Sequence, residues 1–274
     1  MKHIYPIIVS DFDGTLLGDD GRISENNVRA IREYIASGGI FAICTGRMMS
    51  SILPHARGLD LDSLLIAYQG AIILDLKSGK TLRNLFHTAA EAEEICRSME
   101  KLGLHIHVCD GDRFYVNKKD FMLSEYERVC NVKGVYVSGS MADYVAANKI
   151  CPHKVLALVD PEHKTEMLKL LTEQLGDKFY VTTSAGALIE VTKKGCDKGD
   201  AVRFLANYYR IPIESVIAVG DNMNDIPMIS AAGLGIAVFN ADESLKAFAK
   251  EVTVSNNQDA IAHIIRKYGM KENT

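Results

Sequence analysis

The amino-acid sequence predicts an α/β protein with a Rossmann-like parallel-sheet core, helices on both faces of the sheet, and an inserted α+β domain. Short apolar runs alternate with helical patterns at both ends of the chain, as in parallel sheets whose strands are joined by helices. The middle third instead pairs apolar runs around short glycine-containing turns, as in antiparallel hairpins. We therefore expect a discontinuous core at 1–84 and 188–274, with an inserted α/β domain at 85–187.

The first elements of the core are predicted from apolar runs and helix caps. Residues 4–10 form a short apolar run with several β-branched side chains, which favours a buried strand. Ser24 is in position to cap a helix that reaches about Ala36, where Gly38 and Gly39 stop it. The further elements expected here are a strand at 40–44, a turn at Thr45-Gly46, a helix from Arg47, a strand at 64–68 and a hairpin of 71–74 with 81–86.

The middle third begins with a capping box. Thr88 and Glu91 have the spacing of that motif, which opens a helix reaching about Leu102. Apolar runs on either side of Gly111-Asp112 predict a hairpin, and the more polar stretch 118–150 predicts only a helix near 119–130. The remaining elements expected here are a strand at 154–159, a helix from Pro161 to about Leu175, and strands at 178–182 and 187–191.

Strand–helix alternation returns after residue 192. The run 198–209 places Ala201, Leu205 and Tyr208 on one face, which predicts an amphipathic helix. Val216–Val219 is apolar throughout and is expected within a buried strand at 215–219. The further elements expected are a helix at 225–232, a strand at 234–238, a helix at 242–249, a short strand at 252–253 and a helix at 259–268.

Composition limits the classes of partner. The 274 residues carry a net charge of −4, so nothing in the overall charge favours nucleic acid or an anionic membrane. The apolar start of the chain is interrupted by Asp11 and Asp13, which argues against a signal peptide, and no run is long enough to span a bilayer. The six cysteines show no CxxC or metal-like spacing. We expect free thiols and a cytoplasmic protein; the sequence gives no information on oligomeric partners.

The first polar motif is Asp11-Phe12-Asp13-Gly14-Thr15, directly after the first predicted strand. Residues i and i+2 on extended backbone point to the same side, so Asp11 and Asp13 should converge while Phe12 points away. Two converging carboxylates repel each other unless a cation or a shared proton resolves the conflict. The pattern therefore predicts a hard metal ion, or a nucleophile paired with an acid, although exposed acids in a loop are the ordinary alternative.

Two further segments offer groups for an anion. Thr45 and Gly46 lie between a strand and a helix, where a hydroxyl, a backbone amide and a helix N-terminus form a potential anion site. Lys198 opens a helix, an unfavourable position for a cation unless an anion is bound nearby. Taken alone, Thr45 is equally well explained as a helix cap, and Lys198 is better explained as a solvated surface residue.

The last motif is the run from Gly220 to Asp225, which follows the apolar residues 216–219. Asp221 is well placed for a hard cation, which prefers oxygen ligands. The same run also fits an Asx-rich turn that caps a helix at Asp225. Because ligands bind at the carboxyl ends of strands in open α/β sheets, its position after a strand favours the functional interpretation.

Together, Asp-x-Asp, Thr45, Lys198 and Gly-Asp-x-x-Asn-Asp, in this order, resemble the haloacid dehalogenase superfamily of phosphotransferases. The large insertion between the second and third motifs, and the run Gly220-Asp-Asn-Met-Asn-Asp-Ile-Pro-Met228, look like its Cof-type sugar-phosphatase-like branch. The resemblance covers the whole chain and implies that residues 85–187 form a cap domain. One departure is Gln69-Gly70-Ala71, where the branch usually has Asn-Gly-Ala.

The resemblance implies a Mg²⁺-dependent phosphatase that acts on a small phosphorylated metabolite, most readily a sugar phosphate. Asp11 would be the nucleophile and Asp13 the general acid and base. Mg²⁺ would be held by the Asp11 side chain, the Asp13 backbone carbonyl and Asp221, with Asp225 orienting the ligands around it. The groups implied to hold the phosphate are Thr45, the Gly46 amide, Lys198, Asn224 and the Phe12 amide.

Two alternatives share this motif set. A phosphomutase on sugar phosphates would return the phosphoryl group to its substrate, and a non-catalytic regulator would only bind a phosphorylated ligand. Intact acids at all motif positions disfavour the regulator, and dehalogenation would not need the Asp13 acid or a metal. Arg47 is either a salt-bridge residue or a substrate contact. We expect the polar side chains of the predicted cap hairpin to be surface or edge residues: His105, His107, Asp110, Asp112 and Arg113.

Overall fold

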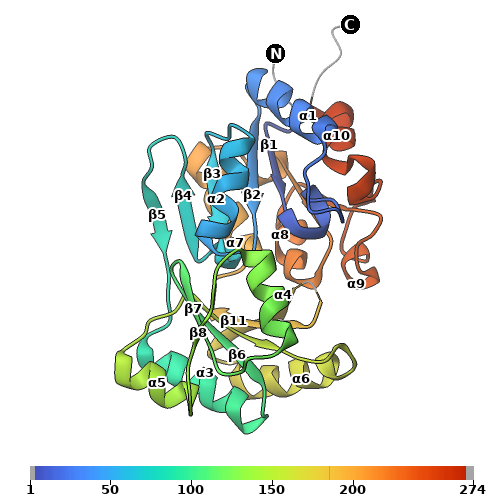
Figure 1. Ribbon diagram of the computed structural model, residues 1–274. Helices are drawn as coiled ribbons and strands as arrows, with labels where there is room; N and C mark the ends of the chain where they lie inside the picture. The colour runs from blue at the N-terminus through green and yellow to red at the C-terminus, as the bar shows by residue number, and fades with distance from the viewer. Residues whose placement is uncertain (1–3, 185, 270–274) are drawn as a thin grey trace, which may run out of the picture. The chain divides into compact units, whose positions relative to one another are not determined.

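The structure, a computed structural model, describes residues 4–184 and 186–269 and divides them into two compact units. The first unit consists of the described residues up to Thr45, of Leu53–Leu82 and of the residues from Asp197 onward. The second consists of Gly46–Ile52 and of the described part of Arg83–Cys196. The chain therefore passes into the second unit twice, briefly at Gly46 and again at Arg83, and returns to the first unit each time (Figure 1).

The first unit is built on an eight-stranded sheet in the order β14-β13-β12-β1-β2-β3-β4-β5. β1 pairs in parallel with both β2 and β12, although β12 lies two hundred residues further along the chain. The central strands are fully buried, as their near-continuous apolar sequences predict. The strands are β1 (Ile7–Ser10), β2 (Ile40–Cys44), β3 (Leu64–Ala67), β4 (Ile72–Asp75), β5 (Thr81–Asn84), β12 (Val216–Gly220), β13 (Leu234–Ala237) and β14 (Glu251–Val252).

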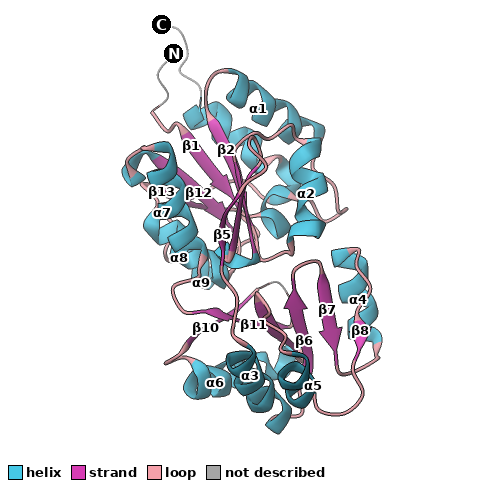
Figure 2. Cartoon of the chain, turned by 90° about the vertical axis from the view of Figure 1, so that its left-hand side faces the viewer, coloured by secondary structure: helices cyan, strands magenta, loops and turns pink. Residues whose placement is uncertain are grey.

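Helices cover both faces of this sheet. Figure 2 shows α1 and α2 on one face and α7 and α8 on the other. α1 begins after Ser24, whose hydroxyl accepts the Asn27 amide, so the predicted cap is confirmed. The helices are α1 (Glu25–Ala36), α2 (Met49–Gly58), α7 (Lys198–Tyr209), α8 (Ile226–Ala231), α9 (Glu243–Lys246) and α10 (Ala260–Ile264).

The second unit has a six-stranded sheet in the order β10-β11-β9-β6-β7-β8, antiparallel except where β7 pairs with β8. α3, α5 and α6 cover one face and enclose a separate apolar core (Figure 2). The predicted Thr88–Glu91 capping box opens α3. The elements are α3 (Ala89–Lys101), β6 (His105–Asp110), β7 (Arg113–Val116), α4 (Phe121–Cys130), β8 (Val135–Tyr136), α5 (Met141–Asn148), β9 (Lys154–Leu158), α6 (Lys164–Leu175), β10 (Phe179–Thr183) and β11 (Leu188–Lys193).

The chain returns to the first unit at Asp197 rather than at the expected residue 188. The difference arises because β11 pairs with β9 and β10 and therefore extends the sheet of the second unit. The first unit also excludes Gly46–Ile52, which the sequence placed in the core.

The prediction that His105 and His107 are surface or edge residues is wrong. Their exposed fractions are 3% and 0%, because they lie on the face of β6 that α4 covers. The ring of His107 packs against Phe114 and against Tyr126 of α4. Asp112 and Arg113 are exposed as expected.

Two sequence-based expectations concern the chain as a whole. All six cysteines are free thiols, and five of them are buried. Among the helices of the described residues, none combines the length and hydropathy that crossing a bilayer requires.

Candidate active site

The candidate active site lies where adjacent parallel strands of the first unit end. Asp11 follows β1, Thr45 follows β2 and Asp221 follows β12. Because β1 lies between the other two strands, parallel pairing brings the three ends to one edge of the sheet. The Asp11 amide continues this pairing by donating to the Val219 carbonyl at 2.9 Å. The topology therefore brings together motifs that are far apart in the sequence.

A tight turn follows Asp11 and sets the side chains of the first motif. The Leu17 amide donates to the Phe12 carbonyl at 2.8 Å and closes the turn. Asp11 is 5% exposed, Phe12 is fully buried against His55, and Asp13 is half-buried. The turn thus leaves Asp13 more accessible to solvent than its neighbour.

Gly14 allows this turn to approach Asp221 closely. Its φ of +71° is in the left-handed region, and a Cβ at this position would lie 2.5 Å from Asp221 Oδ2. The next residue, Thr15, donates from Oγ1 to Asp221 Oδ1 at 2.8 Å. No role for Thr15 was predicted from the sequence, although it stands within the first motif; its bond shows that it orients Asp221.

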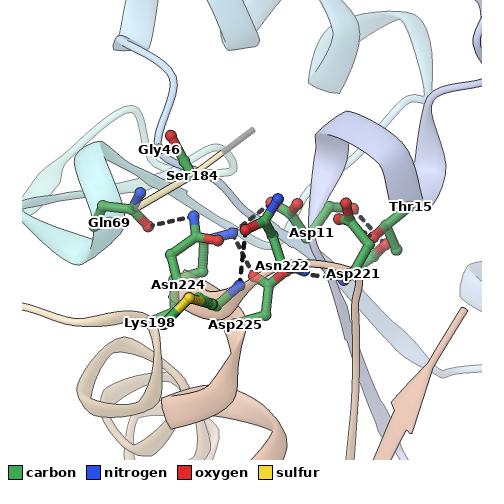
Figure 3. Close-up of polar contacts among 12 residues, drawn as sticks. Asp11, Thr15, Gly46, Gln69, Ser184, Lys198, Asp221, Asn222, Asn224 and Asp225 are labelled. Atoms are coloured by element: carbon green, nitrogen blue, oxygen red, sulfur yellow. Dashed lines mark hydrogen bonds and ion pairs between the residues drawn. The ribbon is translucent and has the colours of Figure 1, made fainter. Parts of the chain in front are cut away.

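Lys198 is the buried cation of the site. It is 1% exposed, and its Nζ lies 2.5 Å from Asp11 Oδ1 and 2.6 Å from Asp225 Oδ1 (Figure 3). Its place in the first turn of α7 is stabilised by Asp197, whose side chain caps the helix. The solvated-surface alternative for Lys198 is therefore wrong.

Asp225 organises the loop after β12. Its Oδ2 accepts the amides of Asp221 and Asn222 at 3.0 and 3.1 Å, while its Oδ1 contacts Lys198. An Asx-rich turn is therefore present as predicted, but Asn222 rather than Asp225 is the cap, because Asp225 makes no side-chain capping bond to α8. Both oxygens of Asp225 are engaged, which fits a residue that orients others.

The site holds more negative than positive charge. Carboxylate oxygens of Asp11, Asp221 and Asp225 lie within 4.8 Å of one another, against the single ammonium of Lys198. Burial, followed by the charge of Asp225, raises the pKa of Asp11 well above its usual value and that of Asp221 to about 7. Burial alone would lower the pKa of Lys198, but Asp11 and Asp225 outweigh it and raise that pKa well above its usual value. Crowded oxygen ligands with excess negative charge are suited to a divalent cation.

Asn224 and Thr45 are buried beside this cluster in the fold. Asn224 is 4% exposed, and its Nδ2 donates to Gln69 Oε1 at 3.2 Å. Thr45 is 1% exposed, and its backbone is fixed by bonds from its amide to the Ile66 carbonyl and from the Gln69 amide to its carbonyl. The contacts of Gln69 were not predicted from the sequence. Its position just after β3, the neighbour of β2 in the sheet, could have indicated that it lies near Thr45.

Gly46 follows Thr45 directly but is grouped with the second unit. Its carbonyl accepts a bond of 2.9 Å from Lys154 Nζ. Arg47 contacts Ser51 and the Val129 carbonyl, both in the second unit, at 3.4 Å. None of these contacts involves the Gly46 amide, so its expected phosphate-binding role stays a prediction.

Comparisons with known proteins place these features in a family. Residues 8–265 match the family model of haloacid dehalogenase-like hydrolases. A putative phosphatase of Haemophilus influenzae is 32% identical over 271 residues, covering 96% of this chain and 98% of that protein. The 5-amino-6-(5-phospho-D-ribitylamino)uracil phosphatase YcsE of Bacillus subtilis is 30% identical, covering 96% of this chain and 95% of that protein.

Solved structures agree with the sequence comparisons. The crystal structure of TM0651 from Thermotoga maritima superposes with a TM-score of 0.78 at 30% identity and covers 98% of both chains. A haloacid dehalogenase-like hydrolase from Bacillus subtilis superposes with a TM-score of 0.85 at 24% identity and shares the fold. The named relatives support a phosphoric monoester hydrolase.

Proposed function

Because this chain belongs to the haloacid dehalogenase-like hydrolases, we propose that it hydrolyses small phosphomonoesters, most readily sugar phosphates, through an aspartyl-phosphate on Asp11. The observation that carries the proposal is the contact of Lys198 with Asp11 beside Asp221, at the carboxyl ends of β1 and β12. This contact places a buried ammonium next to the carboxylate that would attack phosphorus. Phosphoryl transfer needs mainly positioning and charge stabilisation, which such a cluster supplies.

Asp11 and Asp13 would divide the chemistry between them. A carboxylate oxygen of Asp11 forms a bond to phosphorus as the bond from phosphorus to the leaving oxygen breaks, and Asp13 donates a proton to that oxygen. In the second step Asp13 accepts a proton from water as the water oxygen attacks phosphorus. The bond to Asp11 then breaks, which releases inorganic phosphate and regenerates the carboxylate. The greater exposure of Asp13 supports its exchange of protons with solvent.

The excess of carboxylates supports a Mg²⁺ site. The Asp11 side chain, the Asp13 carbonyl and Asp221 would hold the ion, and Asp225 would orient Asp221 and Lys198. When bound, Mg²⁺ supplies positive charge that offsets the developing charge on the phosphoryl group. Thr15 and Gly14 prepare the site by holding Asp221 close to the first turn.

The phosphate holders would be Lys198, Thr45, Asn224 and the amides of Phe12 and Gly46. The burial of the first three supports this assignment, because buried donors act in a low dielectric where their interaction with an anion is strengthened. In this proposal the first unit supplies all of these phosphate holders except the Gly46 amide, and the second unit, as a cap, selects the leaving group. A relative whose name specifies a phosphoribityl compound supports a hydroxylated leaving group.

The test is a panel of phosphate esters, including sugar phosphates, assayed for released phosphate with Mg²⁺ and with EDTA. We expect turnover with Mg²⁺ and its loss with EDTA. Asp11→Asn should reduce turnover by roughly a thousandfold or more, since it removes the nucleophile. The matched control is Asp60→Asn, whose carboxylate is 71% exposed in a surface ion pair with Arg32 and should matter little. Equal, slow hydrolysis by the wild type and Asp11→Asn would exclude the proposal, and isomerisation without free phosphate would indicate a mutase.

A further inference from the structure

The turn Tyr68–Gly70 has an unusual backbone beside the candidate site. Tyr68 and Gln69 have φ values of +52° and +59°, and Gly70 follows at +107°. Two consecutive residues other than glycine in the left-handed region are uncommon, and each of them is strained. Such a conformation persists only where surrounding contacts hold it.

Those contacts connect the turn to three separate segments of the site. The Gln69 amide donates to the Thr45 carbonyl at 3.0 Å. A Cβ on Gly70 would lie 3.1 Å from the Asp197 carbonyl, so the turn packs against the start of the helix that carries Lys198. The Gln69 side chain accepts the bond from Asn224. The turn therefore contacts the backbone of Thr45, the side chain of Asn224 and the residue that precedes Lys198.

The bond between Gln69 and Asn224 is made between two buried amides. Gln69 is 1% exposed and Asn224 is 4% exposed, so neither amide has bulk water as an alternative partner. An amide nitrogen carries two hydrogens, and Gln69 takes one of those on Asn224 Nδ2. Asn224 Oδ1 is buried and has no hydrogen-bond partner among the residues described. The bond to Gln69 fixes the plane of the Asn224 amide and therefore the direction of its second N–H, the hydrogen that remains available to an anion.

We propose that Gln69 is a positioning residue that fixes the amide of Asn224 for phosphate binding. The inference rests on the proposed function, because it assumes that Asn224 holds a phosphate oxygen. Gln69 does not touch the reacting atoms. It acts by keeping the second Nδ2 hydrogen of Asn224 directed toward the phosphate while its own backbone holds Thr45.

A double-mutant cycle tests this coupling. Gln69→Met keeps the length of the side chain but removes the accepting oxygen, and Asn224→Ala removes the group that Gln69 fixes. We expect Gln69→Met to lower kcat/KM about fivefold and to raise the inhibition constant of inorganic phosphate by a similar factor, the effect of one lost hydrogen bond. In the Asn224→Ala background the same change should have less than about a twofold effect. Equal factors in both backgrounds would show a merely structural role and overturn the proposal.

Two further variants keep the test decisive. Gln174→Met, at an exposed position of α6, is the matched control and should leave activity unchanged. Gln69→Gly removes the amide while relieving the positive φ, so it tests the same coupling if Gln69→Met does not fold. If the wild type hydrolyses no ester, the proposed function fails. In that case the dissociation constant of orthophosphate is measured by calorimetry for each variant of the cycle. If Gln69→Met then raises this constant by the same factor with and without Asn224, the role of Gln69 is overturned independently of the proposed function.

Discussion

Both units bury a lysine beside carboxylates, but only one of these clusters is balanced in charge. In the second unit Lys154 lies 2.9 Å from Glu190, and this pair is almost fully buried. The same glutamate accepts a bond from Ser184, and the same lysine donates to the Gly46 carbonyl. In the first unit one lysine faces three carboxylates. Both units bury charge, so the difference lies in the balance: the carboxylates of the first unit outnumber the ammonium, whereas in the second unit one ammonium faces one carboxylate.

The two units also shift the pKa values of their buried titratable groups in opposite directions. The first unit raises the pKa of buried carboxyls, which resist ionisation while they are crowded. The second unit lowers the pKa of buried imidazoles, which resist protonation: His87, His105, His107 and His153. The first arrangement is relieved by a bound ion, whereas the second is satisfied by staying uncharged.

The largest effect expected from this difference between the units is on turnover, which depends on the first unit. Asp13→Asn should lower turnover of sugar phosphates by roughly a hundredfold to ten-thousandfold, because the leaving oxygen loses its acid. With p-nitrophenyl phosphate, whose leaving group needs no proton, the first step should survive and the aspartyl-phosphate should accumulate. Intact-mass measurement after acid quenching detects the added phosphoryl group. An equal defect on both substrates, without accumulation, would contradict the role of Asp13.

The balanced pair of the second unit should show its effect in stability. Lys154→Met removes the ammonium that faces the buried Glu190 carboxylate, which should lower the free energy of unfolding by about 3–5 kcal/mol. Adding Glu190→Gln should recover part of that loss, because it removes the stranded charge. Urea denaturation of the two single variants and the double variant measures both the loss in the free energy of unfolding and its partial recovery. Additive losses in the double variant would show that the two groups are not coupled.

The unbalanced cluster should make stability depend on Mg²⁺ and pH together. Asp221 has a usual pKa near 3.8 in the unfolded chain and about 7 in the fold, so the folded state binds more protons between these values. Without metal, its contribution therefore destabilises the fold progressively as pH rises from about 4 to about 7. The rise in Tm on adding Mg²⁺ should be larger at pH 8 than at pH 5, as measured by calorimetry. A shift that is the same at both values would be inconsistent with a cation at this cluster.

The smallest expected effect is the opposite response of the second unit. Burial lowers the pKa of His87 from about 6.5 to about 4, so the unfolded chain binds more protons within that window. The stability that neutral His87 provides is therefore lost as pH falls from about 6.5 to about 4. His87→Gln, which does not titrate, should flatten the fall in Tm across this range. The matched control is the exposed His163→Gln, which should leave the slope unchanged.

Site residues at the ends of strands were predictable from the sequence, whereas contacts between distant segments were not. Asp11, Asp221 and Lys198 were identifiable because each adjoins a strongly apolar strand or opens an amphipathic helix, and parallel pairing then fixes where they meet. The bounds of α7 agree with the predicted helix. The bond from Asn224 to Gln69 was not predictable, because it depends on a left-handed turn and joins residues 155 positions apart.

The second unit shows the other limit of sequence patterns. Strand alternation indicates which side chains share a face of β6, but not that α4 covers that face and buries His105 and His107. β8 has only two residues, both exposed, so it has too little apolar pattern to predict a strand. α5 was not predicted, because only a helix near 119–130 was expected within the polar stretch 118–150.

The pairing of β1 with β12 has a consequence for biosynthesis. Asp11 and Asp221 are 210 positions apart, and at 5–20 residues per second the ribosome needs roughly 10 to 40 s to make the chain between them. During that interval β1 has an unpaired edge on the side that β12 will occupy, and the whole of Arg83–Cys196 is synthesised before β12. The cluster of Asp11, Asp221 and Asp225 therefore cannot assemble on the nascent chain until the last third emerges, so translation sets the earliest moment at which this protein becomes an enzyme.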